Sequence, residues 1–104
     1  MKAESMLNTF IDWARQVADK PLGKGVEARV TESQVSDNPS ARLDVDTPTT
    51  VARITCWESG DHDAEVIDME TEQTLFSSHG HLRGGHSFSE QFASFFKSLG
   101  IAIE

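Results

Sequence analysis

Carboxylates gather in the middle of the 104-residue chain, where their number and spacing could support binding chemistry. No Lys or Arg lies between Ile54 and Leu82, and the stretch holds seven acidic residues: Glu58, Asp61, Asp63, Glu65, Asp68, Glu70 and Glu72. Side chains alternate along a strand, so we expect Glu65 on the opposite face from Asp68 and Glu70. Two interpretations remain open: an ordinary solvated surface, or a docking surface for a basic groove, where opposite charge speeds encounter.

Trp57 stands directly before the first of these acids, Glu58. Aromatic anchors inside a charged rim are common at the centres of protein interfaces. A tryptophan at such a position is also commonly part of the core, so both places for Trp57 remain open. In the docking interpretation, the residues that contact the partner are Trp57, Glu58, Asp61, Asp63, Asp68, Glu70 and Glu72.

Histidines form a second group with possible chemistry: His79 and His81 flank a glycine, His86 follows, and His62 lies further back. Imidazoles at such spacing can ligate a metal, but the pattern matches no closed zinc site. With an ordinary pKa near ~6.5, these side chains could instead tune the surface charge with pH. The sequence predicts neither a resident metal nor a cofactor.

Nucleophilic chemistry has no support in the sequence. The single cysteine, Cys56, lies in a β-rich stretch and is expected to be a buried structural thiol. The motifs G-x-S-x-G, the phosphate-binding P-loop, G-x-G-x-x-G and H-E-x-x-H are all absent from the sequence. We therefore predict a protein that is not an enzyme.

Composition bounds the class of protein. Nine Lys and Arg against seventeen Asp and Glu give a net charge of −8, which disfavours binding to nucleic acid or to an anionic membrane. Hydrophobic residues make up 38% of the chain, enough for a core, and 104 residues predict one domain over 1–104. One cysteine, no apolar signal segment and no long apolar run favour a soluble protein of the cytoplasm.

Hydrophobic periodicity predicts the elements that position these groups. Apolar residues at helical spacing predict a helix over residues 3–18. Alternating apolar and polar residues predict strands over 26–31, 41–46, 50–58, 64–70 and 74–78, and a Gly- and His-rich loop over 79–85. Short connections favour antiparallel neighbours. We expect an α+β fold in which an antiparallel meander of about five strands carries both helices on one face.

A second helix is predicted over residues 88–99. Ser87 and Glu90 form a capping box, and Gly100 stands where a helix-ending glycine belongs. One face of this helix is strongly apolar and consists of Phe88, Phe92, Phe95, Phe96 and Leu99. That face could complete the core of the domain or serve a dimer.

Together, the pattern resembles small bacterial immunity proteins, and more narrowly the TriTu immunity family. The resemblance rests on the segment from Trp57-Glu58-Ser59-Gly60 to Ala64-Glu65-Val66-Ile67-Asp68, then Leu75, His79 and the helix over 88–99. It implies a cytoplasmic antidote that forms a heterodimer with one cognate toxin domain. The family is associated with ADP-ribosyltransferase effectors of the type VI secretion system.

The resemblance also implies a mechanism for the acidic hairpin. A cleft that grips the pyrophosphate of NAD must offer positive charge, so carboxylates could cover it and pair with its arginines. Two other functions remain open. One is an acidic secretion chaperone or adaptor, which would dimerise. The other is a small metal-dependent enzyme built on His79, His81 and His86.

Overall fold

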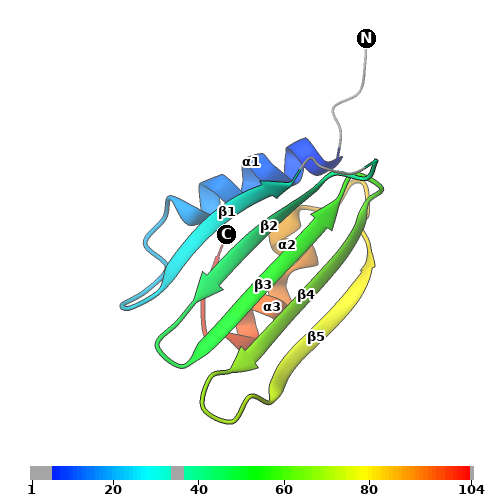
Figure 1. Cartoon of the computed structure of the whole chain (residues 1–104). Coiled ribbons are helices and arrows are strands. Elements are labelled where there is room, and N and C mark those ends of the chain that lie inside the picture. The colour runs from blue at the N-terminus through cyan, green and yellow to red at the C-terminus, as the bar shows by residue number, and fades with distance from the viewer. Residues whose placement is uncertain (1–5, 34–36, 104) are drawn as a thin grey trace.

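The computed structural model describes residues 6–33 and 37–103, which form one sheet with helices on one side (Figure 1). In chain order the elements are α1 (Met6–Ala18), β1 (Glu27–Ser33), β2 (Ser40–Asp46), β3 (Thr50–Trp57), β4 (Asp61–Asp68), β5 (Thr74–His81), α2 (Phe88–Gln91) and α3 (Ala93–Ser98). The strands pair antiparallel in the order β1-β2-β3-β4-β5. The predicted α+β meander is therefore confirmed.

All three helices lie on the same side of the sheet, as predicted. In Figure 1 they lie behind the strands: α1 packs on β1, β2 and β3, while α3 packs on β4 and β5. A hydrogen bond from Trp13 Nε1 to Ser89 Oγ, 3.1 Å long, joins α1 to α2. We call the side under the helices the covered face and the other side the open face.

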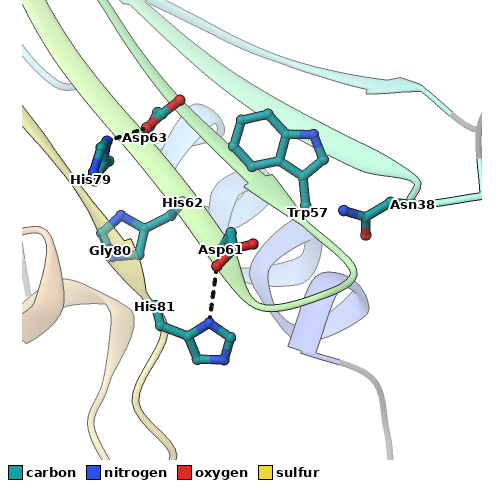
Figure 2. A pocket seen from close by; sticks show the side chains of 8 residues that line it. All are labelled: Asn38, Trp57, Asp61, His62, Asp63, His79, Gly80 and His81. Atoms are coloured by element: carbon teal, nitrogen blue, oxygen red, sulfur yellow. Dashed lines mark hydrogen bonds and ion pairs between the residues drawn. The ribbon is translucent and has the colours of Figure 1, made fainter.

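Alternation along the strands divides the side chains between the two faces. In β3, Ala52, Ile54 and Cys56 are buried on the covered face, whereas Arg53 and Trp57 stand on the open face. In β4, the buried Ala64 and Val66 mark the covered face, so Asp61, Asp63 and Glu65 share the open one. Figure 2 shows Trp57, Asp61 and Asp63 at one end of this surface.

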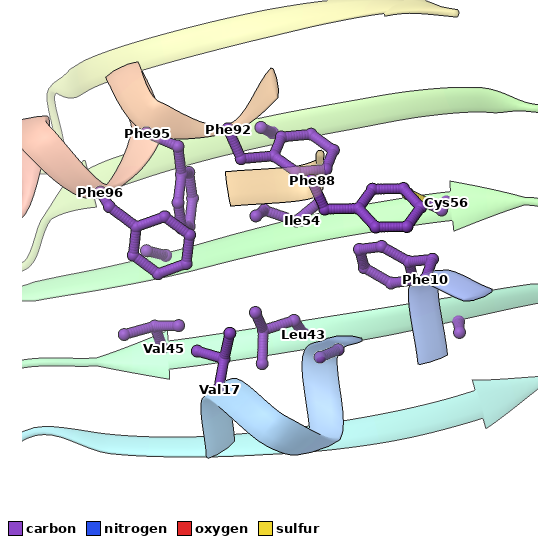
Figure 3. Packing of buried hydrophobic residues seen from close by; sticks show 14 of the residues in the cluster. Phe10, Val17, Leu43, Val45, Ile54, Cys56, Phe88, Phe92, Phe95 and Phe96 are labelled. Carbon is purple, nitrogen blue, oxygen red and sulfur yellow. The ribbon is translucent and has the colours of Figure 1, made fainter. Parts of the chain in front are cut away.

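The core fills the space between the covered face and the helices (Figure 3). Phe10 of α1 packs edge-on against Phe88, with ring centroids 5.8 Å apart. Phe95 and Phe96 make a similar contact at 5.0 Å, and both are buried. Burying one such ring contributes about 1.5–3 kcal/mol, so these phenylalanines hold the helices on the sheet.

The prediction of one continuous helix over 88–99 is wrong. Phe92 separates α2 from α3 with φ −108° and ψ 17°, although its N–H still donates to Phe88 O. The break lets Phe88 and Phe92 pack on Phe10 while Phe95 follows the sheet toward Phe76. Because these rings fill the chain's own core, they are not available to form a dimer.

The predicted ends of that helical segment are confirmed. Ser87 Oγ accepts a hydrogen bond of 3.1 Å from the backbone N–H of Glu90, which caps α2. Gly100 has φ 72°, the left-handed conformation that favours glycine after a helix. At the other end of the chain, α1 begins at Met6, and the remainder of the helix predicted over 3–18 lies outside the described residues.

The predicted hairpin of β4 and β5 needs two corrections. β4 spans Asp61–Asp68 rather than 64–70, and β5 spans Thr74–His81 rather than 74–78, so residues 79–81 are strand and not loop. The extra residues pair across the hairpin, Asp61 with His81 and Asp63 with His79. The strand ends where Asp68 Oδ1 accepts hydrogen bonds from the N–H groups of Glu70 and Thr71.

Candidate functional site

A hollow of about 580 Å³ lies at the Trp57 end of the sheet. Residues of β3, β4, β5 and the segment before β2 line it: Asn38, Trp57, Asp61, His62, Asp63, His79, Gly80 and His81 (Figure 2). One indole, two carboxylates and three imidazoles therefore meet here. The register of the hairpin sets each lining residue of β4 opposite one of β5, and this pairing fixes their positions.

Two aspartate–histidine pairs cross from β4 to β5 within this site. His81 Nδ1 lies 3.1 Å from Asp61 Oδ1, and His79 Nδ1 lies 3.5 Å from Asp63 Oδ1. A hydrogen bond with His81, and to a smaller extent one with Ser59, lowers the pKa of the Asp61 carboxyl below its ordinary value. The aspartate is therefore held ionised, and its direction is fixed by two partners.

The turn between β3 and β4 is built around Gly60. This residue has φ 96°, and a Cβ added there would lie 2.9 Å from Nε2 of His81. Ser59 Oγ donates to Asp61 Oδ2 at 3.1 Å, and the Ser59 N–H donates to Asn38 Oδ1 at 3.0 Å. Glycine thus lets the imidazole of His81 close over the turn and reach the carboxylate.

Trp57 belongs to the open face and not to the core. Its side chain is half-buried, and the buried cluster includes its neighbour Cys56 on the other face instead. Of the two places that the sequence left open for Trp57, the structure therefore excludes the core. Protein interfaces favour aromatic rings at their centre and polar or charged side chains around that centre.

His62 reaches the hollow from the covered face. Its ring packs edge-on against Phe92 at 5.2 Å, and its buried Nδ1 atom finds no hydrogen-bond partner among the residues that the structure describes. Burial is the largest cause of the lowered pKa of this imidazole. The neutral form is therefore favoured, and His62 acts as part of the wall rather than as a charged contact.

The structure divides the seven predicted contact residues between two ends of the sheet. Trp57, Glu58, Asp61 and Asp63 lie at or beside the hollow, whereas Asp68, Glu70 and Glu72 lie at the turn between β4 and β5. Since β4 has eight residues, Asp61 and Asp68 at its two ends lie roughly 23 Å apart. Backbone N–H groups of Thr71 and Glu70 lower the pKa of Asp68, whose carboxylate serves the turn.

The open face is less uniformly acidic than the sequence indicates. Asp44 of β2 is only 5% exposed, because Arg42 Nε and Arg53 Nε lie 2.9 and 3.1 Å from its two oxygens. Arg29 is paired with Asp46 at 3.5 Å. Arginines thus pair with Asp44 and Asp46 of β2, whereas Asp61 and Asp63 of β4 pair with histidines.

Sequence reasoning missed four residues at or beside this site. The sequence gives no reason to include Glu65, yet it shares the open face with Asp61 and Asp63. His79 and His81 were placed in a loop, although D-x-D followed by H-x-H is the spacing that two paired strands need to set acids opposite imidazoles. Asn38 is distant in sequence, and no local pattern identifies it.

Among the described residues, the structure assembles neither a metal site from the histidines nor a reactive site at Cys56. His79 and His81 pair with different carboxylates, and His86 Nδ1 lies 3.9 Å from a Glu90 oxygen. Within residues 6–33 and 37–103, no three His, Cys, Asp or Glu side chains are arranged to hold a metal ion. Cys56 is buried as predicted, and burial raises the pKa of its thiol, which disfavours the reactive thiolate.

Comparison with known proteins gives one result that bears on function. The family model described as Immunity protein TriTu matches residues 8–98. The matched range includes β1–β5, α2, α3 and all but the first two residues of α1. A search of curated proteins finds no match for the chain. Among the described residues, no helix is long and apolar enough to span a membrane.

Proposed function

Because this chain belongs to the TriTu family of immunity proteins, we propose that it binds one cognate secreted toxin domain and neutralises it by occlusion. The open face around Trp57 supplies the contact. The observation that carries this placement is the juxtaposition of a half-buried indole with the carboxylates of Asp61 and Asp63. The indole forms the desolvated centre, and the carboxylates form a charged rim.

The toxin that fits this surface has a basic active-site cleft. An ADP-ribosyltransferase is such an enzyme, since its cleft must neutralise the pyrophosphate of NAD. Carboxylates on β4 can pair bidentately with the arginines of that cleft and exclude the dinucleotide. In this proposal the protein acts in the cytoplasm of a bacterium exposed to type VI secretion. There it forms a heterodimer with the toxin domain.

Inhibition in this proposal requires no turnover. The imidazoles of His79 and His81 are engaged with carboxylates, and the Cys56 thiol is buried on the covered face. The protein therefore acts by stoichiometric binding. Opposite charges speed the encounter, while the centre of the contact sets the lifetime of the complex.

Matched charge reversals test this placement. Asp63→Lys with Glu65→Lys alters the β4 acids beside the hollow, and Glu70→Lys with Glu72→Lys makes the same charge change at the far turn. The probe is an inactive variant of the toxin domain encoded by the neighbouring upstream reading frame. Calorimetry should show binding weakened on the order of 100-fold by the first pair, because each reversed charge meets a like charge in the cleft.

The far pair is the control and is expected to bind like the unaltered protein. Cells that carry the active toxin should survive with the control variant and die with the β4 variant. Unchanged affinity in the β4 variant would contradict the proposed site. Failure of the unaltered protein to bind this toxin domain would contradict the function itself.

A further inference from the structure

The outer edge of β5 is an unpaired strand edge beside the proposed site. β5 pairs with β4 on one side only, and it ends the sheet (Figure 1). The Leu82 N–H donates to Gly60 O at 2.7 Å, so these two residues form a hydrogen-bonded pair of the hairpin. Hydrogen-bonded and non-hydrogen-bonded pairs alternate along an antiparallel ladder. Alternation then turns the backbone groups of Ser78 and Gly80 toward β4 and those of Ser77, His79 and His81 outward.

These outward groups have no strand beside them within the part of the chain that the structure describes. Among residues 6–33 and 37–103, β4 is the only strand that pairs with β5, and the register leaves the N–H and C=O of Ser77, His79 and His81 on the other side. Their side chains stand on the open face, so the free backbone edge and the hollow are continuous. A partner on the open face therefore meets this edge as well.

The opposite edge of the sheet is protected, and β5 is not. β1 carries the charged residues Glu27, Arg29 and Glu32. Glu32 also forms an ion pair with Arg15 of α1. Charged side chains are a usual protection of strand edges against pairing with other chains. Thr74–His81 contains no Lys, Arg, Asp, Glu or Pro, so β5 is an edge on which another strand can add.

Charge decides which strand fits. Asp61, Asp63 and Glu65 on β4 lie two strand spacings from an added strand, roughly 10 Å, which is on the order of the Debye length at physiological salt. A second copy of this chain would bring the same carboxylates and a net charge of −8 to the contact. A strand with Lys or Arg at alternate positions is favoured instead.

We infer that the toxin supplies this strand: an extended basic segment of the toxin pairs with β5 and continues the sheet. The inference rests on the proposed function and specifies how the same face is engaged. Backbone hydrogen bonds then provide affinity, and the alternate side chains on the open face provide specificity. The added strand directs its basic side chains over His79 and His81 toward the acids of β4.

Hydrogen exchange on the unaltered protein tests the inference. In the free protein, the amides of Ser77, His79 and His81 are expected to exchange fast and those of Ser78 and Gly80 slowly. Binding of the inactive toxin domain should slow the three outward amides at least about tenfold, because each gains a hydrogen bond. A complex in which these amides stay fast would overturn the inference and leave the proposed function intact.

Two other outcomes are equally decisive. If no complex forms with the toxin domain, both the function and the inference fall. If the outward amides become protected in the protein alone as its concentration rises, a second copy is the occupant, and the assignment to a toxin strand is wrong.

A pair of substitutions at Ser77 gives an independent readout. Ser77→Pro removes an outward N–H without touching the bonds to β4, while Ser77→Thr keeps the N–H and the hydroxyl. Both variants should show the melting temperature of the unaltered protein, and only the proline variant should bind the toxin domain at least about tenfold more weakly. Equal binding by both variants would contradict pairing at this edge. If the proline variant does not fold, the exchange experiment decides alone.

Discussion

The two faces of the sheet use the same five strands but are organised by different interactions. On the covered face, Leu43 and Ile54 have no exposed surface and pack under the helices. On the open face, by contrast, the acidic residue Asp44 is buried and held between two arginines. Apolar packing therefore determines the free energy of unfolding, and the open face is free to carry a binding surface. Substitutions on each face test this division of roles.

The largest effect is expected on the covered face. Phe95→Ala should lower the free energy of unfolding by about 3–5 kcal/mol, because it removes a fully buried ring and leaves a cavity. Phe95 contacts Phe96 at 5.0 Å and Phe76 at 6.3 Å. Denaturant unfolding measures the change. An unaltered unfolding midpoint would show that the covered face does not determine stability.

On the open face, Trp57→Ala should act on binding instead. We expect a loss of about 2–4 kcal/mol in the free energy of toxin binding, typical of an aromatic residue at the centre of an interface. The melting temperature should remain close to that of the unaltered protein. Val51→Ala is the matched control, since Val51 is 38% exposed and stands on the same face of the same strand. Equal losses in the two variants would contradict the placement of the site.

Asp44 is the exception on the open face, where a polar residue should affect stability. Asp44→Ala leaves Arg42 and Arg53 without their shared carboxylate and should cost about 1–2 kcal/mol, less than a fully buried pair because both arginines reach water. Asp46→Ala, which breaks the longer 3.5 Å pair with Arg29, should cost less than about 0.5 kcal/mol. Thermal unfolding of both variants measures the difference, and equal costs would show that burial of Asp44 is unimportant.

The smallest predicted effect concerns His62, the polar residue of the covered face. Its pKa is lowered by burial from the ordinary 6.5. The unfolded state then binds the proton more readily, so stability is greatest above pH 6.5 and decreases as the pH falls through the window between the two pKa values. Asp61, Asp63, His79 and His81 are the charged groups that act on it.

His62→Phe removes this titration and the unpaired Nδ1 atom while keeping an aromatic edge against Phe92. The variant should be more stable by about 1 kcal/mol and should lose the pH dependence below 6.5. Unfolding measured between pH 5 and 8 provides the comparison. The same pH slope in both proteins would show that His62 is not the group responsible.

Local sequence signals predicted most of the covered face. Alternation in β3 placed Ala52, Ile54 and Cys56 together, and the capping pattern at Ser87 gave the start of α2. The break at Phe92 was missed because apolar periodicity is almost the same in one helix and in two short ones. The strand at residues 79–81 was missed because Gly and His are poor strand signals when cross-strand partners are unknown.

The candidate site was predicted only in part, since it depends on register. The acids were visible as a run, but their separation into two groups follows from the length of β4. The charge of Asp44 is balanced only because the register of β2 and β3 sets Arg53 opposite Asp44. No local pattern encodes that alignment, because strand pairing is set by side chains far apart in the sequence.

The central claim is that this protein blocks its toxin by one-to-one occlusion. Titrating a fixed amount of the active toxin domain with the protein, and following toxin activity, tests it most directly. The prediction is a linear decrease that reaches zero at one equivalent and does not deepen with time. Loss of activity or reversal of the toxin's product at a small fraction of an equivalent would reveal turnover and contradict the claim.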